Sequence, residues 1–155
     1  MHIRELFSLN DKVALVTGGS GNYGKCMVEG LAEAGATVIT ASRDMVVGTA
    51  TAAAFRERGL EVHALKVDQC NTASVMALKR KIQVSCGQLD IFVNNAVARP
   101  MRSYNDPLVH FSESMQVNAT GMMDILREMA DLMQQGNGGS IINIASMMGM
   151  FGPDL

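Results

Sequence analysis

The chain has 155 residues, of which 48% are hydrophobic, 18% charged and only 5% aromatic. This composition predicts one globular domain and excludes a fibrous, disordered or membrane-spanning chain. Thirteen basic residues against 15 acidic ones give a formal net charge of −2, without the clustered Lys and Arg of a nucleic-acid-binding surface. The 3 cysteines are not spaced as metal ligands or a redox pair, and the charged N-terminus has no apolar run, so we expect a cytoplasmic protein with reduced thiols and no metal site.

Short β-rich apolar runs alternate along the chain with longer segments of helical period. The predicted strands begin near Val13, Thr37, Glu61, Asp90 and Ser140. The predicted helices cover about Tyr23–Ala34, Met45–Arg58, Thr72–Ser85 and Pro107–Gln135. The glycines expected at their C-caps are Gly35, Gly59, Gly87 and Gly136. Strands such as VALVT (13–17) and IFVN (91–94) are almost continuously apolar, as in a parallel sheet covered on both faces. The alternation predicts a Rossmann-like, doubly wound α/β fold.

The first predicted strand runs directly into TGGSGNYGK (17–25), which opens the first long helix. Glycines in this context let the backbone approach a pyrophosphate closely, and the helix dipole favours its negative charge. A tight turn without a ligand is the alternative, although it needs fewer small residues. The candidate phosphate-binding residues are Thr17, Gly18, Ser20, Gly21, Asn22, Tyr23 and Gly24.

This turn resembles the T-G-x-x-x-G-x-G motif of the short-chain dehydrogenase/reductase family. Thr17, Gly18 and Gly24 match the motif, whereas Asn22 stands in place of its middle glycine. Asn tolerates a positive φ better than most residues, and the adjacent Gly21 adds further freedom. The resemblance implies a Rossmann fold that binds a nicotinamide dinucleotide.

The second predicted strand ends where such a fold meets the adenosine ribose. Ala41 occupies the position at which NAD-preferring relatives carry an acid, and Arg43, beside Ser42, stands where NADP-preferring relatives carry arginine. The resemblance therefore predicts NADP(H), with NAD(H) as the alternative. Asp44 precedes a helix and is expected to cap it. Asp68 matches the family's adenine-side acid, or is a loop carboxylate or the cap of the next helix.

The fourth predicted strand ends in Asn94-Asn95-Ala96, which resembles the family's N-N-A-G with Val97 in place of the glycine. Two amide side chains that leave a buried strand need hydrogen-bond partners. Without the resemblance they indicate a polar turn. With it they are expected to brace the sheet and line the cofactor crevice.

The helical segment 107–135 carries an apolar stripe, expected to be core or a subunit contact, made of Phe111, Met115, Met122, Ile125, Met129 and Leu132. Asn118 falls on this stripe, so its amide must bond to a backbone group or hold a water. The residue matches the asparagine of the family's V-N-x-x-G at positions 117–121. The resemblance implies that Asn118 helps to maintain a proton relay.

The fifth predicted strand, SIINIAS (140–146), brings Ser146 to its carboxyl end. In the family this serine hydrogen-bonds the substrate oxygen, the Tyr of Y-x-x-x-K is the general acid/base, and its Lys lowers the pKa of that Tyr. Here Tyr23 is followed four residues later by Met27, and Tyr104 by Leu108, so the catalytic pair is missing from the chain. We therefore expect residues 1–155 to be a single NAD(P)-binding Rossmann domain, incomplete at its C-terminus, truncated after the fifth strand and left with an exposed apolar edge.

The resemblance implies an NADP(H)-dependent oxidoreductase that acts on a small carbonyl or alcohol substrate, and a homo-oligomer in the full-length form. The alternative is a non-catalytic dinucleotide-binding module. A flavodoxin-like or receiver domain is disfavoured, because its first turn does not need this many glycines. Arg99 and Arg102 suit an anionic or sugar-like substrate, or belong to a solvated loop.

Overall fold

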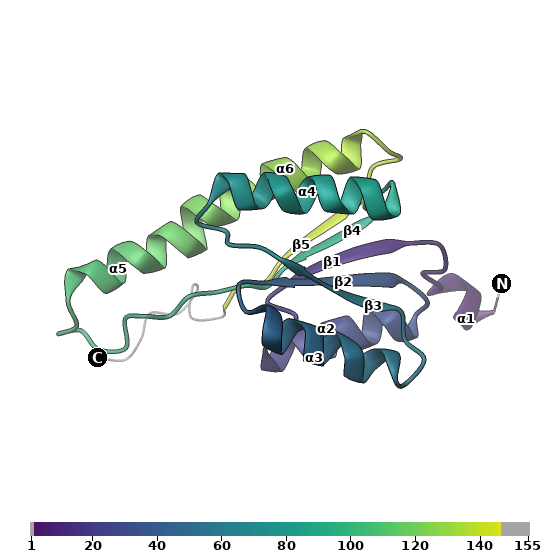
Figure 1. Cartoon of the computed structure of the whole chain (residues 1–155), viewed down its shortest axis with the longest axis horizontal. Coiled ribbons are helices and arrows are strands. Elements are labelled where there is room, and N and C mark those ends of the chain that lie inside the picture. The colour runs from purple at the N-terminus through teal and green to yellow at the C-terminus, as the bar shows by residue number, and fades with distance from the viewer. Residues whose placement is uncertain (1, 147–155) are drawn as a thin grey trace.

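The computed structural model describes residues 2–146, in which strands and helices alternate as the sequence predicts (Figure 1). The strands are β1 (Val13–Thr17), β2 (Thr37–Ser42), β3 (Val62–Lys66), β4 (Ile91–Asn94) and β5 (Ser140–Asn143). The helices are α1 (Ile3–Leu6), α2 (Asn22–Glu33), α3 (Met45–Arg56), α4 (Thr72–Cys86), α5 (Leu108–Met115) and α6 (Met122–Gln134). The short α1 is not among the predicted elements.

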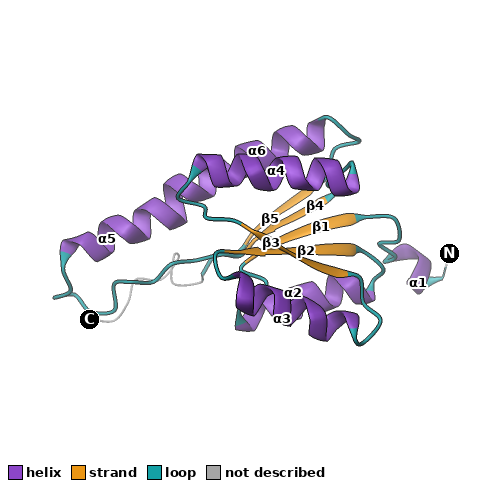
Figure 2. Ribbon diagram, in the orientation of Figure 1, coloured by secondary structure: helices purple, strands orange, loops and turns teal. Residues whose placement is uncertain are grey.

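The described strands form one parallel sheet in the order β3-β2-β1-β4-β5 (Figure 2). From β1 the chain moves outward to β3 and then returns past β1 to β4, so the strand order reverses between β1 and β4. Such a reversal leaves a crevice at the carboxyl ends of the strands, where doubly wound folds bind ligands. The predicted fold class is confirmed.

Helices cover both faces of the sheet, with α2 and α3 on one face and α4 and α6 on the other (Figure 1). Alternate side chains of β1 point to opposite faces. Leu15 joins the core that contains Phe92 and the apolar faces of α4 and α6. Val16 joins the opposite core with Val28 of α2 and Phe55 of α3. Every residue of β1 is therefore buried, which explains its continuous apolar sequence.

The segment predicted as one helix over 107–135 is interrupted by a π-helical turn at Gln116–Gly121, between α5 and α6. A π turn contains an extra residue, so it rotates the side chains on its two sides relative to each other. The apolar stripe is buried in α6, at Ile125, Met129 and Leu132, whereas α5 projects beyond the sheet (Figure 1) and its Phe111 and Met115 are 50% and 47% exposed. Only the α6 half of the stripe is core.

Two predicted boundaries differ from the structure. β5 ends at Asn143 rather than at residue 146, and its edge is apolar and exposed, with Ile142 47% exposed. Left-handed backbone follows the helices at Gly35, Gly59 and Gly87 as expected, but after α6 it occurs at Gly138 and not at Gly136.

Within residues 2–146, no helix has the length and apolarity needed to cross a lipid bilayer.

Candidate functional site

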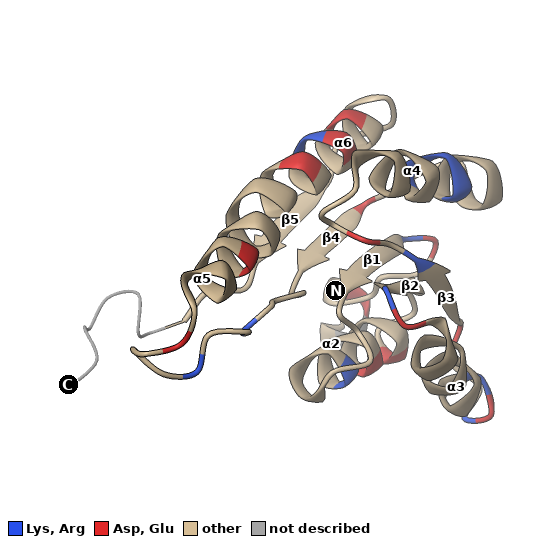
Figure 3. Cartoon of the chain, turned by 60° about the vertical axis from the view of Figure 1, so that its left-hand side comes forward, with Lys and Arg blue, Asp and Glu red and all other residues tan. Residues whose placement is uncertain are grey.

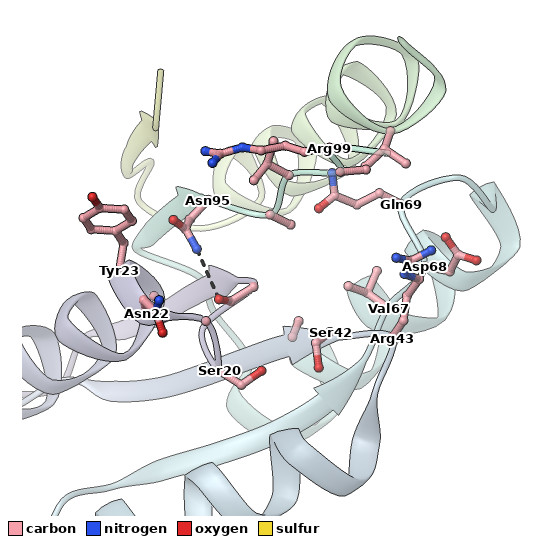
Figure 4. Close-up of a pocket in the computed structure, with 18 of the residues that line it drawn as sticks. Ser20, Asn22, Tyr23, Ser42, Arg43, Val67, Asp68, Gln69, Asn95 and Arg99 are labelled. Atoms are coloured by element: carbon pink, nitrogen blue, oxygen red, sulfur yellow. Dashed lines mark hydrogen bonds between the residues drawn. The ribbon is translucent and has the colours of Figure 1, made fainter. Parts of the chain in front are cut away.

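A crevice of about 580 Å³ lies at the carboxyl ends of the central strands, next to the point where the strand order reverses (Figure 4). One wall is the glycine turn between β1 and α2, and the opposite wall is the segment that follows β4. Its predicted lining residues are Gly18, Ser20, Gly21, Asn22, Tyr23, Gly24, Ser42, Arg43, Asp68, Asn95 and Ala96. The fold thus brings together side chains from four separate loops.

Close backbone packing shapes the glycine turn. Gly18 has φ 65, and its N–H donates to the Ala41 carbonyl of β2 at 2.8 Å. A Cβ on Gly24 would lie 2.2 Å from the Gly18 oxygen, so only glycine fits there. Asn22 is the first residue of α2 and does not have a positive φ, so the tolerance expected of Asn is not needed. Glycine is instead required at Gly24, where α2 crosses the turn.

Thr17 does not line the crevice, but its side chain connects the two walls by hydrogen bonds. Its fully buried hydroxyl accepts hydrogen bonds from the backbone N–H groups of Asn95 and Ala96, both at 3.1 Å. The same hydroxyl lies 3.2 Å from Asn94 Oδ1, to which it donates. One side chain therefore ties the end of β1 to the end of β4.

Both amide side chains at the end of β4 form hydrogen bonds, as the sequence predicts. Asn94 is buried and its Nδ2 donates to Asn143 Oδ1 of β5 at 3.2 Å. Asn95 Nδ2 donates to the carbonyl oxygens of Thr17 and Gly18, at 3.1 and 3.2 Å. Asn94 braces the neighbouring strand, and Asn95 fixes the glycine turn against the opposite wall.

The crevice ends beside β2 and β3 in a group of polar side chains. Ser42 Oγ donates to the Asp44 carbonyl at 3.0 Å, and the Asp44 carboxylate accepts from two amides of α3, which confirms it as an N-cap. Asp68 is not the cap of α4, because that role belongs to Asn71; its Oδ1 instead accepts from Cys70 N at 3.0 Å.

Arg43 is a basic side chain at this end of the crevice. Among residues 2–146, no carboxylate forms an ion pair with Arg43. Burial and the nearby Asp68 raise the pKa of the Cys70 thiol, while Arg43 opposes that shift. Arg99 and Arg102, also in the crevice lining, lie in the loop that leads from β4 to α5, where Figure 3 shows basic positions.

Asn118 lies in the π-helical turn and bonds to one backbone unit of the opposite wall. Its Oδ1 accepts from Ala98 N at 2.8 Å, and its Nδ2 donates to the Ala98 oxygen at 2.7 Å. Of the two options expected for this amide, the structure shows the bond to backbone. The relay role of Asn118 stays a prediction, and what the geometry shows is that it positions the loop after β4.

Ser146 lies beyond the end of β5, is exposed and is not part of the crevice lining. Tyr23 is 77% exposed and stands at the end of the crevice opposite Arg43 (Figure 4). Gln69, which lines the crevice next to Asp68, is not among the residues predicted for the site. Nothing in the sequence distinguishes this glutamine from a surface one, because its burial is a property of the folded chain.

The chain matches a family model described as short chain dehydrogenase over residues 12–154. An uncharacterized oxidoreductase of Thermotoga maritima is 37% identical over 139 residues, which cover 89% of this chain and 54% of that protein. The chain spans about half the length of the curated relatives it matches.

Two solved structures with cofactors share the fold. An NAD+-bound xylitol dehydrogenase has a TM-score of 0.87 and 29% identity, covering 93% of this chain and 56% of the other. A Pseudomonas aeruginosa RhlG/NADP active-site complex has a TM-score of 0.85 and 30% identity, covering 100% of this chain and 60% of the other. Together with the glycine turn, the braced Asn-Asn-Ala segment and the match over residues 12–154, these similarities show that the chain belongs to the short-chain dehydrogenase family.

Proposed function

We propose that the protein is an oxidoreductase that uses NADP(H) to transfer a hydride between the nicotinamide and a carbonyl compound or secondary alcohol. The observation that carries the proposal is the crevice at the strand reversal, with a glycine turn on one wall and, at one end, Arg43, which forms no ion pair with any described carboxylate. Related chains support it, since the xylitol dehydrogenase structure holds NAD+ and the RhlG structure holds NADP. When bound, the nicotinamide donates or accepts the hydride.

The residues of the crevice fit a dinucleotide in both shape and chemistry. Helix α2 begins without a side-chain cap, which leaves its first amides for an anionic phosphate. A Cβ on Gly21 would meet only the Gly18 oxygen, at 3.3 Å, so this side of the turn is open. We assign the phosphates to the turn from Gly18 to Gly24 and the adenosine end to Ser42, Arg43 and Asp68.

The substrate side of the proposal rests on two other residues. Ser146 follows β5, so it stands at the carboxyl end of the sheet, where it can orient a substrate oxygen by a hydrogen bond. Asn118 holds the Ala98 backbone, and with it the wall that a nicotinamide would face. The substrate class is a small carbonyl or alcohol, and the half-exposed apolar residues of α5, Phe111 and Met115, support assembly as a homo-oligomer.

Residues 1–155 alone are expected to bind NADPH without catalysing its oxidation. Neither tyrosine has a lysine four residues later, so no described pair can hold the proton of a substrate alcohol near neutral pH. NADPH oxidation should therefore stay at the buffer rate with a panel of aldehydes and ketones, while NADPH binding is seen by fluorescence. NADPH oxidation above that rate would overturn this expectation. It would also exclude the alternative that residues 1–155 are a non-catalytic dinucleotide-binding module.

The preference for NADP(H) is expected to depend on Arg43. We expect tighter binding of NADPH than of NADH, and we expect Arg43→Ala to weaken NADPH binding about tenfold while leaving NADH nearly unchanged, because only NADPH carries the 2′-phosphate. The measurement is a titration of both cofactors by calorimetry. Arg80→Ala, at an exposed arginine outside the crevice, is the matched control and should change neither affinity. Equal affinities in the wild type, or an equal loss for both cofactors in Arg43→Ala, would contradict the assignment.

A further inference from the structure

The charged residues of the crevice are mostly basic, although the chain as a whole is slightly acidic. The lining contains three arginines, Arg43, Arg99 and Arg102, and one aspartate, Asp68. The formal net charge of the whole chain is −2. Because a cleft lined by one sign of charge attracts ligands of the opposite sign, the crevice suits a negatively charged ligand.

Arg99 and Arg102 are exposed, and neither side chain is neutralised by a neighbour. Among residues 2–146, no carboxylate forms an ion pair with either guanidinium, and this includes Glu113, which lines an adjoining cavity together with Arg99. Asp106 accepts instead from the backbone N–H groups of Arg102 and Ser103, at 2.7 and 3.1 Å. The aspartate therefore holds the turn that carries Arg102 and does not pair with its guanidinium.

The backbone next to Arg99 is anchored as well. The N–H and the carbonyl oxygen of Ala98 both bond to the side chain of Asn118, at 2.8 and 2.7 Å. Pro100, on the other side of Arg99, restricts the backbone further. Arg99 thus projects from a fixed point of the crevice wall, and a fixed backbone lowers the entropy cost of binding a ligand.

The side chain of Arg99 reaches the end of the crevice that lies away from Arg43. Figure 4 shows it extending toward the end where Tyr23 and Asn95 stand. In the proposed function, Arg43 binds the 2′-phosphate and the first amides of α2 bind the pyrophosphate, so the phosphates of the cofactor have other partners. A dinucleotide that has its adenosine near Arg43 has its nicotinamide at the opposite end. Arg99 is therefore a cation on the side where the substrate meets the nicotinamide.

We propose that Arg99, together with Arg102, binds an anionic oxygen group of the substrate, so that the carbonyl compound or alcohol carries a carboxylate or a phosphate. This inference rests on the proposed function. A guanidinium donates two parallel hydrogen bonds to the oxygens of such a group, and the charges make these bonds stronger than neutral ones. A neutral sugar would not use the charge of either arginine.

The test measures binding of small carbonyl compounds to residues 1–155 saturated with NADP+, by ligand-observed NMR in a buffer of physiological ionic strength, which screens non-specific attraction. The probes are two matched pairs, levulinate with its amide and dihydroxyacetone phosphate with dihydroxyacetone. The wild type should bind the anionic member of at least one pair about tenfold more tightly than the neutral member. The pair that shows the preference distinguishes a carboxylate from a phosphate.

Arg99→Ala should abolish this preference and leave the affinity for NADP+ nearly unchanged. Arg99→Lys should keep part of the preference, because lysine retains the charge without the planar fork. Arg80→Ala, at an exposed arginine outside the crevice, is the matched control and should change neither quantity. A preference that survives in Arg99→Ala would contradict the inference, and so would a loss of NADP+ affinity in that variant, since it would assign Arg99 to the cofactor.

Failure of this inference can be told from failure of the proposed function. If the wild type binds NADP+ but neither anionic probe binds better than its neutral partner, the anionic substrate is wrong and the proposed function stands. If the wild type binds neither NADP+ nor NAD+, the proposed function fails and the inference fails with it.

Discussion

Replacing Thr17 with Val is expected to lower the free energy of unfolding by about 2–4 kcal/mol, because the change leaves buried groups without their partner. The hydroxyl accepts from Asn95 N and Ala96 N and donates to Asn94 Oδ1, and Thr17 has no exposed surface. Valine has nearly the same shape, so the loss reports the hydrogen bonds rather than a cavity. The measurement is urea unfolding followed by far-UV circular dichroism, since the chain has no Trp.

Thr17→Ser is the matched control. It keeps the hydroxyl and removes one methyl group, so it should cost about 1 kcal/mol. The same variant should bind NADPH almost normally, whereas Thr17→Val should bind it weakly, because the wall after β4 is no longer held to β1. Equal unfolding free energies for the Val and Ser variants would show that the hydroxyl does not brace these strands.

The strands and their sheet could be predicted because burial on both faces leaves a direct mark on the sequence. β1 reads VALVT because each of its residues packs against one of two helical layers. The need of Asn94 and Asn95 for partners was also predictable, since amides at the end of a buried strand cannot remain unbonded. Which atoms would meet them was not, because Thr17 and Asn143 are distant in sequence and adjacent only through the strand order.

Features that depend on packing between distant segments could not be predicted from the sequence. The π turn at Gln116–Gly121 has the same apolar periodicity as a regular helix over a short window, so the segment was expected to be continuous. The same turn packs against the loop after β3, where a Cβ on Gly121 would lie 2.5 Å from the backbone carbonyl oxygen of Gln69.

The departure of Asn22 from the family motif illustrates the same limit. From the sequence, Asn22 was expected to replace a glycine because Asn tolerates a left-handed φ better than most residues. In the structure this residue is helical, so no such tolerance is required. The position that requires glycine is Gly24, two residues later. There α2 passes so close to the backbone of Gly18 that a side chain does not fit.

Gly24→Ala is therefore expected to abolish most dinucleotide binding, with a loss of more than tenfold in NADPH affinity and about 1–3 kcal/mol in unfolding free energy. The new Cβ would lie 2.2 Å from the Gly18 oxygen and 2.7 Å from the Gly19 Cα. These are backbone atoms of the glycine turn, so the strain cannot be relieved by a side-chain rotation. Either the turn or the start of α2 must shift, and both carry the amides assigned to the phosphates.

Gly30→Ala provides the matched control within the same helix. Gly30 is exposed, and a Cβ there meets nothing within 4 Å, so alanine should stabilise α2 by about 0.5–1 kcal/mol through helix propensity. In urea unfolding, the free energy of unfolding should fall in Gly24→Ala and rise in Gly30→Ala. In NADPH titration, binding should be lost only in Gly24→Ala. If Gly24→Ala binds NADPH as the wild type does, the amides of this turn do not hold the phosphates, because a shift forced at Gly24 cannot leave them in place.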